Sequence, residues 1–194
     1  MLTESGFNLT TRLQFHILRH FTAPGEEYIA ELSKSSGYSP EEILEQVSLT
    51  GSKFHAAFAR NPLELWEIIK SEMQKHNHSV KTIFQRRVYG FDFSREKYPG
   101  GIGTTGLSKI SDLTESEKLT LKEELRGGFA VLTVSLEKQS PTWEMHLVVL
   151  LTSDPFITTI FPGVYAPPFP DRPVQDEEEK RACEEFWKEH ALVR

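Results

Sequence analysis

Apolar residues recur every three or four positions through the first part of the chain, which is the spacing of an amphipathic helix. This spacing predicts helices over 11–21, from about Glu26 to Gly37, after Ser39 and after Asn61. The last two begin with a capping residue followed by proline, an arrangement typical of helix starts. We expect the helix after Asn61 to be the most regular. It should bury Leu63, Trp66, Ile69 and Met73.

The spacing changes after about residue 79, where β-branched and aromatic residues become frequent. Val80 to Phe93 predicts one strand, and 129–136, 143–151 and 156–161 predict three more. Because short turns separate the last three strands, we expect them to be antiparallel neighbours in a meander. A glycine-rich link, 99–106, follows the first strand.

Two more helices are predicted in this half. One begins at the capping box Thr114-Glu115-Ser116-Glu117, runs to about Leu125 and ends at Gly127-Gly128. The other is an amphipathic helix at 176–192, with Cys183, Phe186 and Trp187 on its inner side. The predicted fold is α+β: a helical N-terminal half, an antiparallel sheet of about four strands and a C-terminal helix. We divide it into a helical region, 1–78, and a sheet domain, 79–194.

Composition narrows the class of protein. With 38% hydrophobic and 26% charged residues, the chain has the balance of a folded globular protein. Its net charge of −6 argues against a protein that coats nucleic acid, although it leaves room for a local basic cleft. A single cysteine, Cys183, cannot form an intrachain disulfide. No signal peptide or membrane-spanning segment is evident, so we expect a soluble, cytoplasmic protein.

Several motifs that often bind ligands lack the necessary context here. Gly101 to Gly106 has the glycine spacing of a dinucleotide-binding loop but does not follow a buried strand. His16 and His20 lie four residues apart on a predicted helix, and His76 and His78 flank Asn77, without a cysteine or glutamate to complete a zinc site. We therefore expect neither a cofactor nor a metal.

Polar residues of the predicted sheet suggest chemistry on phosphate. Thr142, Glu144 and His146 alternate along one strand and so share a face, which is either solvated or lines a cleft. Cleaving RNA without a metal requires a base for the 2′-hydroxyl, an acid for the leaving oxygen, and cations or hydroxyls around the phosphate. Arg87 lies on the first predicted strand with Arg86 before it, Arg126 precedes the second strand, and Arg87 and Arg126 could supply the cations.

The segment 127–170 adds a resemblance. Its strands, the Pro141-Thr142 turn and the runs Ile157-Thr158-Thr159-Ile160-Phe161-Pro162-Gly163 and Ala166-Pro167-Pro168-Phe169-Pro170 resemble the C-terminal sheet of bacterial toxin ribonucleases of the barnase, EndoU, colicin and RelE class. The resemblance implies that Thr159 or Thr158 is the site threonine and that Thr142 contacts phosphate. It also implies a base on an upstream helix, for which His55 is the candidate.

The sequence therefore predicts a metal-independent endoribonuclease of bacterial toxin type. We expect His146 to be the acid or base, with His55 second, Arg87 and Arg126 at the phosphate, and Thr142 and Thr159 as hydroxyl donors. Its partners would be RNA and a cognate inhibitor or other protein.

The alternative is a non-enzymatic acidic binding module, such as an antitoxin, immunity or adaptor protein. It would dock through the C-terminal acidic helix and segment 161–173. A DNA-binding module at 10–75 is disfavoured by its few basic residues. The oligomeric state is left open.

Overall fold

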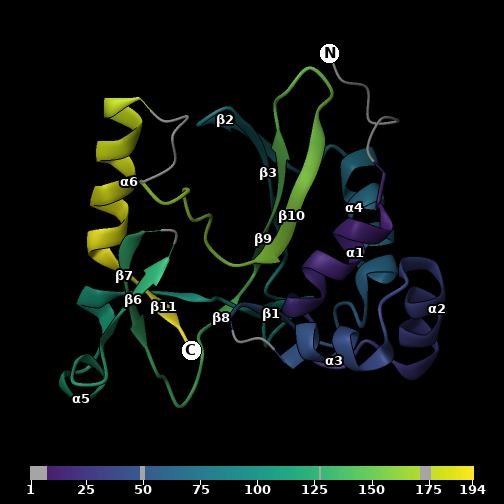
Figure 1. Ribbon diagram of the computed structural model, residues 1–194, viewed down its shortest axis with the longest axis horizontal. Helices are drawn as coiled ribbons and strands as arrows, with labels where there is room; N and C mark the ends of the chain where they lie inside the picture. Colours follow the sequence, from purple (N-terminus) through teal and green to yellow (C-terminus); the bar gives the residue numbers. More distant parts are fainter. Residues whose placement is uncertain (1–7, 49–50, 127, 171–175) are drawn as a thin grey trace.

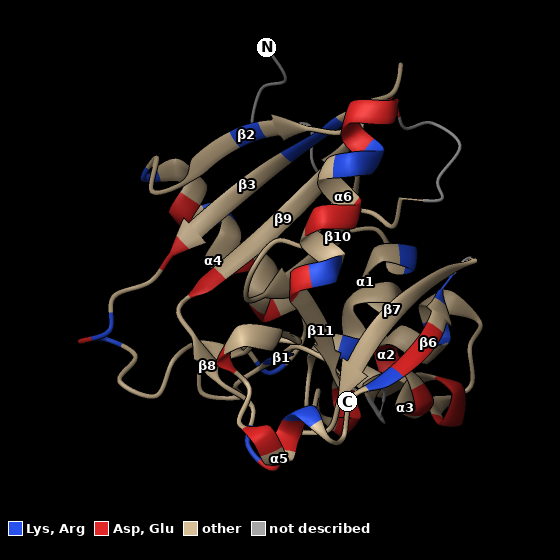
Figure 2. Cartoon of the chain, turned by 90° about the vertical axis from the view of Figure 1, so that its left-hand side faces the viewer, with Lys and Arg blue, Asp and Glu red and all other residues tan. Residues whose placement is uncertain are grey.

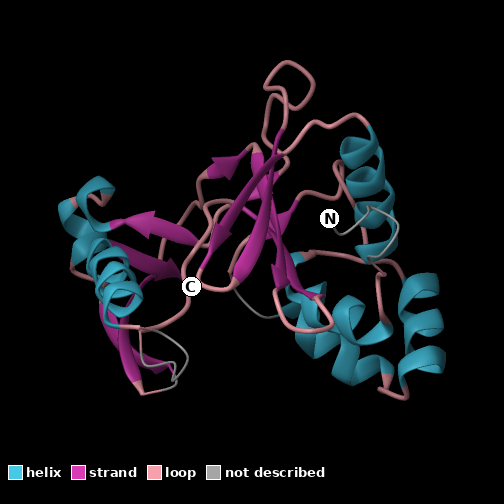
Figure 3. Ribbon diagram, turned by 90° about the horizontal axis from the view of Figure 1, so that it is seen from above, coloured by secondary structure: helices cyan, strands magenta, loops and turns pink. Residues whose placement is uncertain are grey.

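The computed structural model describes residues 8–48, 51–126, 128–170 and 176–194. The N-terminal helices lie on one side of a central sheet, and a second sheet with the last helix lies on the other (Figures 1 and 3). The structure is therefore mixed α+β, as predicted. No described helix combines the length and apolarity needed to cross a bilayer.

The N-terminal helices begin and end at the residues that the sequence indicates. They are α1 (Thr11–Ile17), which continues as a 3-10 turn (Leu18–His20), α2 (Glu26–Ser36), α3 (Pro40–Ser48) and α4 (Pro62–Gln74). The capping box before α3 is present, because the Glu42 backbone N–H donates to the Ser39 hydroxyl and the Ser39 N–H donates to the Glu42 carboxylate. The prediction for Leu63 is wrong, since it is 44% exposed and Leu65 is buried in its place.

The central sheet has the strand order β10-β9-β3-β2 and is antiparallel throughout. Its strands are β2 (Ser79–Ile83), β3 (Arg86–Asp92), β9 (Glu144–Leu150) and β10 (Phe156–Pro162). The single strand predicted over Val80 to Phe93 is wrong, because β2 and β3 form a hairpin. Its turn is made by Phe84 and Gln85, both at positive φ. Neither is a glycine or asparagine, so the usual signal for such a turn is missing.

The second sheet has the order β5-β11-β7-β6. Its strands are β5 (Leu107–Lys109), β6 (Lys122–Arg126), β7 (Phe129–Val134) and β11 (His190–Val193). Of the predicted meander, the antiparallel pairing of β9 with β10 is confirmed, but the place of the first strand is wrong. That strand, β7, belongs to the second sheet, where it pairs with β6 and, in parallel, with β11. The helix predicted from Thr114 to Leu125 is only α5 (Glu115–Lys118), preceded by a 3-10 turn (Ile110–Asp112) and followed by β6. Gly127 lies outside the described residues.

The C-terminal helix α6 (Glu177–Glu189) packs on the second sheet and buries Cys183 and Trp187, as predicted. The predicted end at 192 is wrong, because the chain continues from His190 as the strand β11. Three short strands connect the two halves: β1 (Lys53–Phe54), β4 (Gly103–Thr104) and β8 (Pro141–Thr142). A Cβ added at Gly103 would lie 2.2 Å from the Lys53 carbonyl oxygen. This close approach accounts for one glycine of the glycine-rich link without a ligand.

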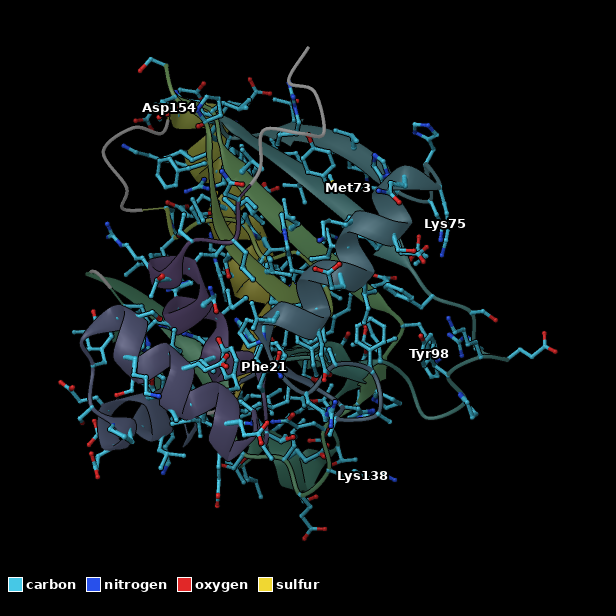
Figure 4. The ribbon with its side chains drawn as sticks, turned by 90° about the vertical axis from the view of Figure 1, so that its right-hand side faces the viewer. Phe21, Met73, Lys75, Tyr98, Lys138 and Asp154 are labelled. Carbon is cyan, nitrogen blue, oxygen red and sulfur yellow. The ribbon has the colours of Figure 1, made fainter. Side chains whose placement is uncertain are left out.

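The largest core lies between the helices and the central sheet. Phe21, Leu65 and Ile69 from the helical side meet Met145 and Leu147 of β9, all essentially unexposed. Figure 4 shows Phe21 and Met73 on the helical side of this layer. Residues of the regions 1–78 and 79–194 thus share one core, which fixes the helices against one face of the central sheet and leaves the opposite face for other contacts.

Candidate functional site

A polar groove lies along β10, where α1, the start of β3 and the segment 165–168 come together. It consists of two hollows, of about 310 and 590 Å³, which share His16 and Thr158. The smaller hollow opens on the face of the central sheet away from the core, which we call the groove face. It is lined by His16, Arg86, Val148, Leu150, Thr158, Thr159, Phe161, Tyr165, Ala166 and Pro168.

A β-bulge brings two threonines to the groove. Ile157 pairs with Val149 and Thr159 pairs with Val148, so Thr158 is the extra residue between them. Neighbouring residues of a regular strand face opposite sides, whereas a bulge re-aims one of them. The Thr158 hydroxyl donates to the Val148 carbonyl at 3.1 Å. Thr158 and Thr159, the two residues that the resemblance implied, therefore both line the groove.

The β2–β3 hairpin selects which arginine reaches the groove. Arg86 pairs with Leu150 of β9 and lines the smaller hollow with it. Arg87 follows it and points to the opposite face, the side on which Tyr89 and Phe91 are buried in the core. Figure 2 shows basic residues at the start of β3 and acidic residues at its end. The groove thus lies at the basic end of this strand.

His16 comes to the groove from α1, whose inward residues Leu13 and Ile17 fix the helix against the core. Burial lowers the pKa of His16, and the nearby guanidinium groups of Arg19 and Arg12 lower it further. Arg19 also donates from Nε to the His16 carbonyl at 3.0 Å. Nη2 of Arg19 lies 3.5 Å from Nδ1 of His16 and can only donate, so Nδ1 is the nitrogen with the lone pair. The imidazole of His16 is therefore neutral at pH 7, as a general base must be, and it acts as a base when the 2′-hydroxyl takes the place of Arg19 at Nδ1.

Tyr165 offers a hydrogen-bond donor that nothing in the described part of the chain satisfies. Its hydroxyl oxygen is buried and has no partner there. Burial raises the pKa of Tyr165, with Arg86 opposing the effect, so the hydroxyl keeps its proton. A buried hydroxyl without a partner costs about 1–3 kcal/mol, which a ligand oxygen would recover.

His146 lies beside the groove without lining it. Its ring centre is 5.8 Å from that of Phe161 and 6.1 Å from that of Tyr165. Nδ1 lies 2.9 Å from the Gly163 carbonyl, which can only accept, so Nδ1 carries the proton and Nε2 keeps its lone pair. Burial lowers the pKa of His146. Its neutral ring faces the same side of the sheet as Val148 and Leu150.

The remaining predicted site residues lie elsewhere. His55 contacts the Gly101 carbonyl at 3.2 Å, and the Thr142 hydroxyl accepts from the Glu144 N–H at 3.2 Å within the β8–β9 link. Thr142 belongs to β8 and not to β9, so it does not form a polar stripe with His146. The residues that follow His146 on the same face of β9 are the apolar Val148 and Leu150. Arg126 pairs with Glu124 at 2.9 Å on β6, in the second sheet.

The structure therefore brings Thr159 and, nearby, His146 to one place, and adds three residues that the sequence did not select: His16, Arg86 and Tyr165. A signal for His16 existed, because the resemblance called for a base on an upstream helix and His16 lies on the first one. No such signal identified Tyr165, whose position depends on how the segment 163–170 crosses the sheet.

Within the described ranges, no three or more His, Cys, Asp or Glu side chains gather in a way that could hold a metal ion. No protein-family model matches the chain, and no curated protein matches it in sequence. The function is therefore argued from the groove itself.

Proposed function

We propose that this chain cleaves RNA by a metal-independent reaction in the groove along β10, as an endoribonuclease of the toxin type. The observation that carries the proposal is the meeting of a neutral histidine, His16, with Arg86 and Tyr165 in the lining of one hollow. The hydroxyl of Tyr165 is buried and has no partner among the described residues. A base, a cation and a hydrogen-bond donor are the groups that phosphoryl transfer requires.

The local charge supports an anionic ligand although the protein as a whole is acidic. Arg86 lines the smaller hollow and Arg12 the larger one. Among the described residues that line the two hollows, Asp154 is the one carboxylate. Figure 4 places Asp154 at the far end of the β9–β10 hairpin, away from Phe21. A phosphate at Arg86 would thus meet a positive environment within a chain of net charge −6.

The proposed reaction is an internal transfer at one phosphodiester. His16 takes the proton of the ribose 2′-hydroxyl, and the 2′ oxygen forms a bond to phosphorus. The bond between phosphorus and the 5′ oxygen breaks, and the leaving oxygen takes a proton from solvent water. His16 releases to solvent the proton that it took, so the step balances. Arg86 offsets the phosphate charge, while Thr159 and Tyr165 donate hydrogen bonds to its oxygens. The products are a 2′,3′-cyclic phosphate and a free 5′-hydroxyl.

A matched pair of histidine variants tests the proposal. Wild-type protein, His16→Gln and His55→Gln are incubated with total RNA in EDTA, after circular dichroism has shown equal folding. His16→Gln should lose roughly a hundred- to ten-thousandfold in cleavage rate, the range for a general base. His55→Gln should retain the wild-type rate, because His55 does not line the groove.

Intact RNA with the wild-type protein would contradict the proposal and favour the alternative function, an acidic binding module. For that function α6 offers the exposed carboxylates Glu177, Glu178, Glu185 and Glu189. Part of its second predicted docking segment, residues 171–173, lies outside the described residues.

A further inference from the structure

A second cavity, which we call the side cavity, adjoins the groove and has a different character. It has a volume of about 250 Å³ and shares Phe161 and Ala166 with the groove as a common wall. Its other walls are mainly apolar and come from β10, the segment after it, and β5 and β11 of the second sheet. They include Leu107, Pro162, Val164, Leu192 and Val193.

Among the described residues, three polar side chains line this cavity: His20, Ser52 and Arg194, whose guanidinium pairs with Glu124 at 3.1 Å. His20 is the one of them that comes from the helical side of the groove. Its Nδ1 lies 2.8 Å from the Ser52 carbonyl oxygen and 3.1 Å from the Ser52 hydroxyl. A carbonyl oxygen can only accept, so Nδ1 carries the proton and Nε2 is left with its lone pair. The same assignment excludes a serine–histidine nucleophile pair, because a protonated Nδ1 cannot take the Ser52 proton.

His20 remains an acceptor over the whole physiological range. Burial lowers its pKa to about 3, and Arg19 and Lys53 act in the same direction. A ligand in the cavity therefore meets mainly apolar walls, an aromatic ring, the acceptor nitrogen of His20, and the side chains of Ser52 and Arg194. The Phe161 ring centre is 6.1 Å from that of His20.

The helical segment formed by α1 and the following 3-10 turn contributes a histidine to the groove and another to the side cavity. His16 lies on α1 and lines the groove, and His20, four residues later in the following 3-10 turn, lines the side cavity. Phe161 contributes to both. A ligand held by its phosphate in the groove could thus extend past Phe161 into the cavity.

We propose that the side cavity receives the nucleobase of the nucleotide whose phosphate lies in the groove. This inference rests on the proposed function for the position of the phosphate. A nucleobase has flat apolar faces that stack on an aromatic ring and N–H groups that can donate to Nε2 of His20. The volume, about 250 Å³, falls just below the roughly 300–1,000 Å³ of sites for larger ligands. It suits one heterocycle better than a whole nucleotide.

Binding of small ligands tests this without any cleavage. Affinities of the four nucleoside 5′-monophosphates and of ribose 5-phosphate are measured by calorimetry with the full chain. Val164→Phe fills the cavity from a residue that is 47% exposed, so the core need not rearrange. Val80→Phe is the matched control, since Val80 is 49% exposed on β2 and lines neither the cavity nor the groove.

In the wild-type protein at least one nucleotide should bind about tenfold or more tightly than ribose 5-phosphate, the size of a stacking contribution. Val164→Phe should remove this difference while leaving ribose 5-phosphate binding unchanged, and Val80→Phe should preserve it. Equal affinity for ribose 5-phosphate and all four nucleotides, no nucleotide binding, or an unchanged difference in Val164→Phe would overturn the inference. Base-dependent binding that Val164→Phe abolishes, in a protein that leaves RNA intact, would uphold the inference and overturn the proposed cleavage.

Discussion

The two faces of the central sheet are built from alternate residues of the same strands, yet they differ in kind. On β9, Met145, Leu147 and Val149 face the helices and are not exposed at all. The intervening residues, His146, Val148 and Leu150, face the groove side together with Arg86 of β3. Along β9 the core face is entirely apolar, whereas the groove side carries His146 and, from β3, Arg86, which are costly to bury.

This difference identifies the groove side as the face whose polar groups lower the stability of the fold. The core face is mainly apolar, whereas the groove side holds a buried tyrosine hydroxyl without a described partner and histidines kept neutral by burial. Groups with shifted pKa values and unmet hydrogen bonds are characteristic of functional sites. The comparison therefore predicts that substitutions on the two faces will separate stability from activity.

The largest effect on stability is expected on the core face. Leu147→Ala removes a fully buried side chain and should lower the free energy of unfolding by about 2–5 kcal/mol. Thr159→Ala, on the groove side, should lower it by less than about 1 kcal/mol while reducing RNA cleavage. Urea unfolding monitored by circular dichroism measures both. A larger loss in Thr159→Ala than in Leu147→Ala would mean that the two faces have been assigned the wrong way round.

Acid should destabilise the protein through the histidines of the groove side and the side cavity, because burial lowers the pKa of His16, His20 and His146. Burial sets the pKa of His20 near 3 in the folded chain, against 6.5 for an ordinary histidine. Above pH 6.5 this residue is neutral in both states and its contribution is fully present. As the pH falls from 6.5 toward 3, His20 is protonated in the unfolded chain but stays neutral in the folded chain, so the folded state loses stability.

The free energy of unfolding should then fall by at most about 1.4 kcal/mol per pH unit for His20. His16 and His146 act in the same direction, since the pKa of each is also lowered. Urea midpoints measured from pH 7 to pH 4 check this, with His20→Asn as the variant that removes the titration but keeps a donor for the Ser52 carbonyl. A slope that His20→Asn leaves unaltered would assign the acid sensitivity to other groups.

Tyr165→Phe should move stability and activity in opposite directions. Removing a buried hydroxyl that has no described partner should leave the free energy of unfolding unchanged or raise it by about 1 kcal/mol. The same change removes a donor to the phosphate and should reduce kcat/KM roughly tenfold. Both quantities are measured on one preparation. Destabilisation by the variant would show that the hydroxyl is satisfied in solution.

The smallest effect concerns the pH profile. Arg12 is exposed and lowers the pKa of His16, so Arg12→Gln should raise that pKa. The acid limb of kcat/KM for RNA, which falls as His16 is protonated, should move upward by roughly a few tenths of a pH unit. Glu26→Gln, on α2 and outside the groove lining, is a control for which no movement is expected.

Local patterns were sufficient for the elements that depend on neighbouring residues. The cap at Ser39, the Asn61 start of α4 and the strand that became β9 follow from spacing and side-chain chemistry alone. Failures arose where a distant partner decides the outcome. The strand β11 forms because β5 and β7 flank it, and Leu125 lies in a strand rather than a helix because β6 pairs with β7.

The position of the site residues also depends on a distant pairing, namely the register of β3 in the central sheet. Alternation along β3 showed that Arg86 and Arg87 face opposite sides, but not which of them faces the core. A shift of one residue would exchange them. The β2–β3 hairpin sets that register through its turn at Phe84 and Gln85. Neither residue type predicts a turn, so the register could not be read from the sequence.

These two adjacent arginines provide the most direct test of where the site lies. Values of kcat/KM are measured in EDTA for a short RNA with wild-type protein, Arg86→Ala and Arg87→Ala, each checked for folding by circular dichroism. Arg86→Ala should reduce kcat/KM roughly a hundred- to a thousandfold, the scale of losing one electrostatic contact to the reacting phosphate. Arg87→Ala should remain within about twofold of wild type, as expected for a residue that touches no phosphate. Equal losses, or a greater loss in Arg87→Ala, would contradict a site on the groove face.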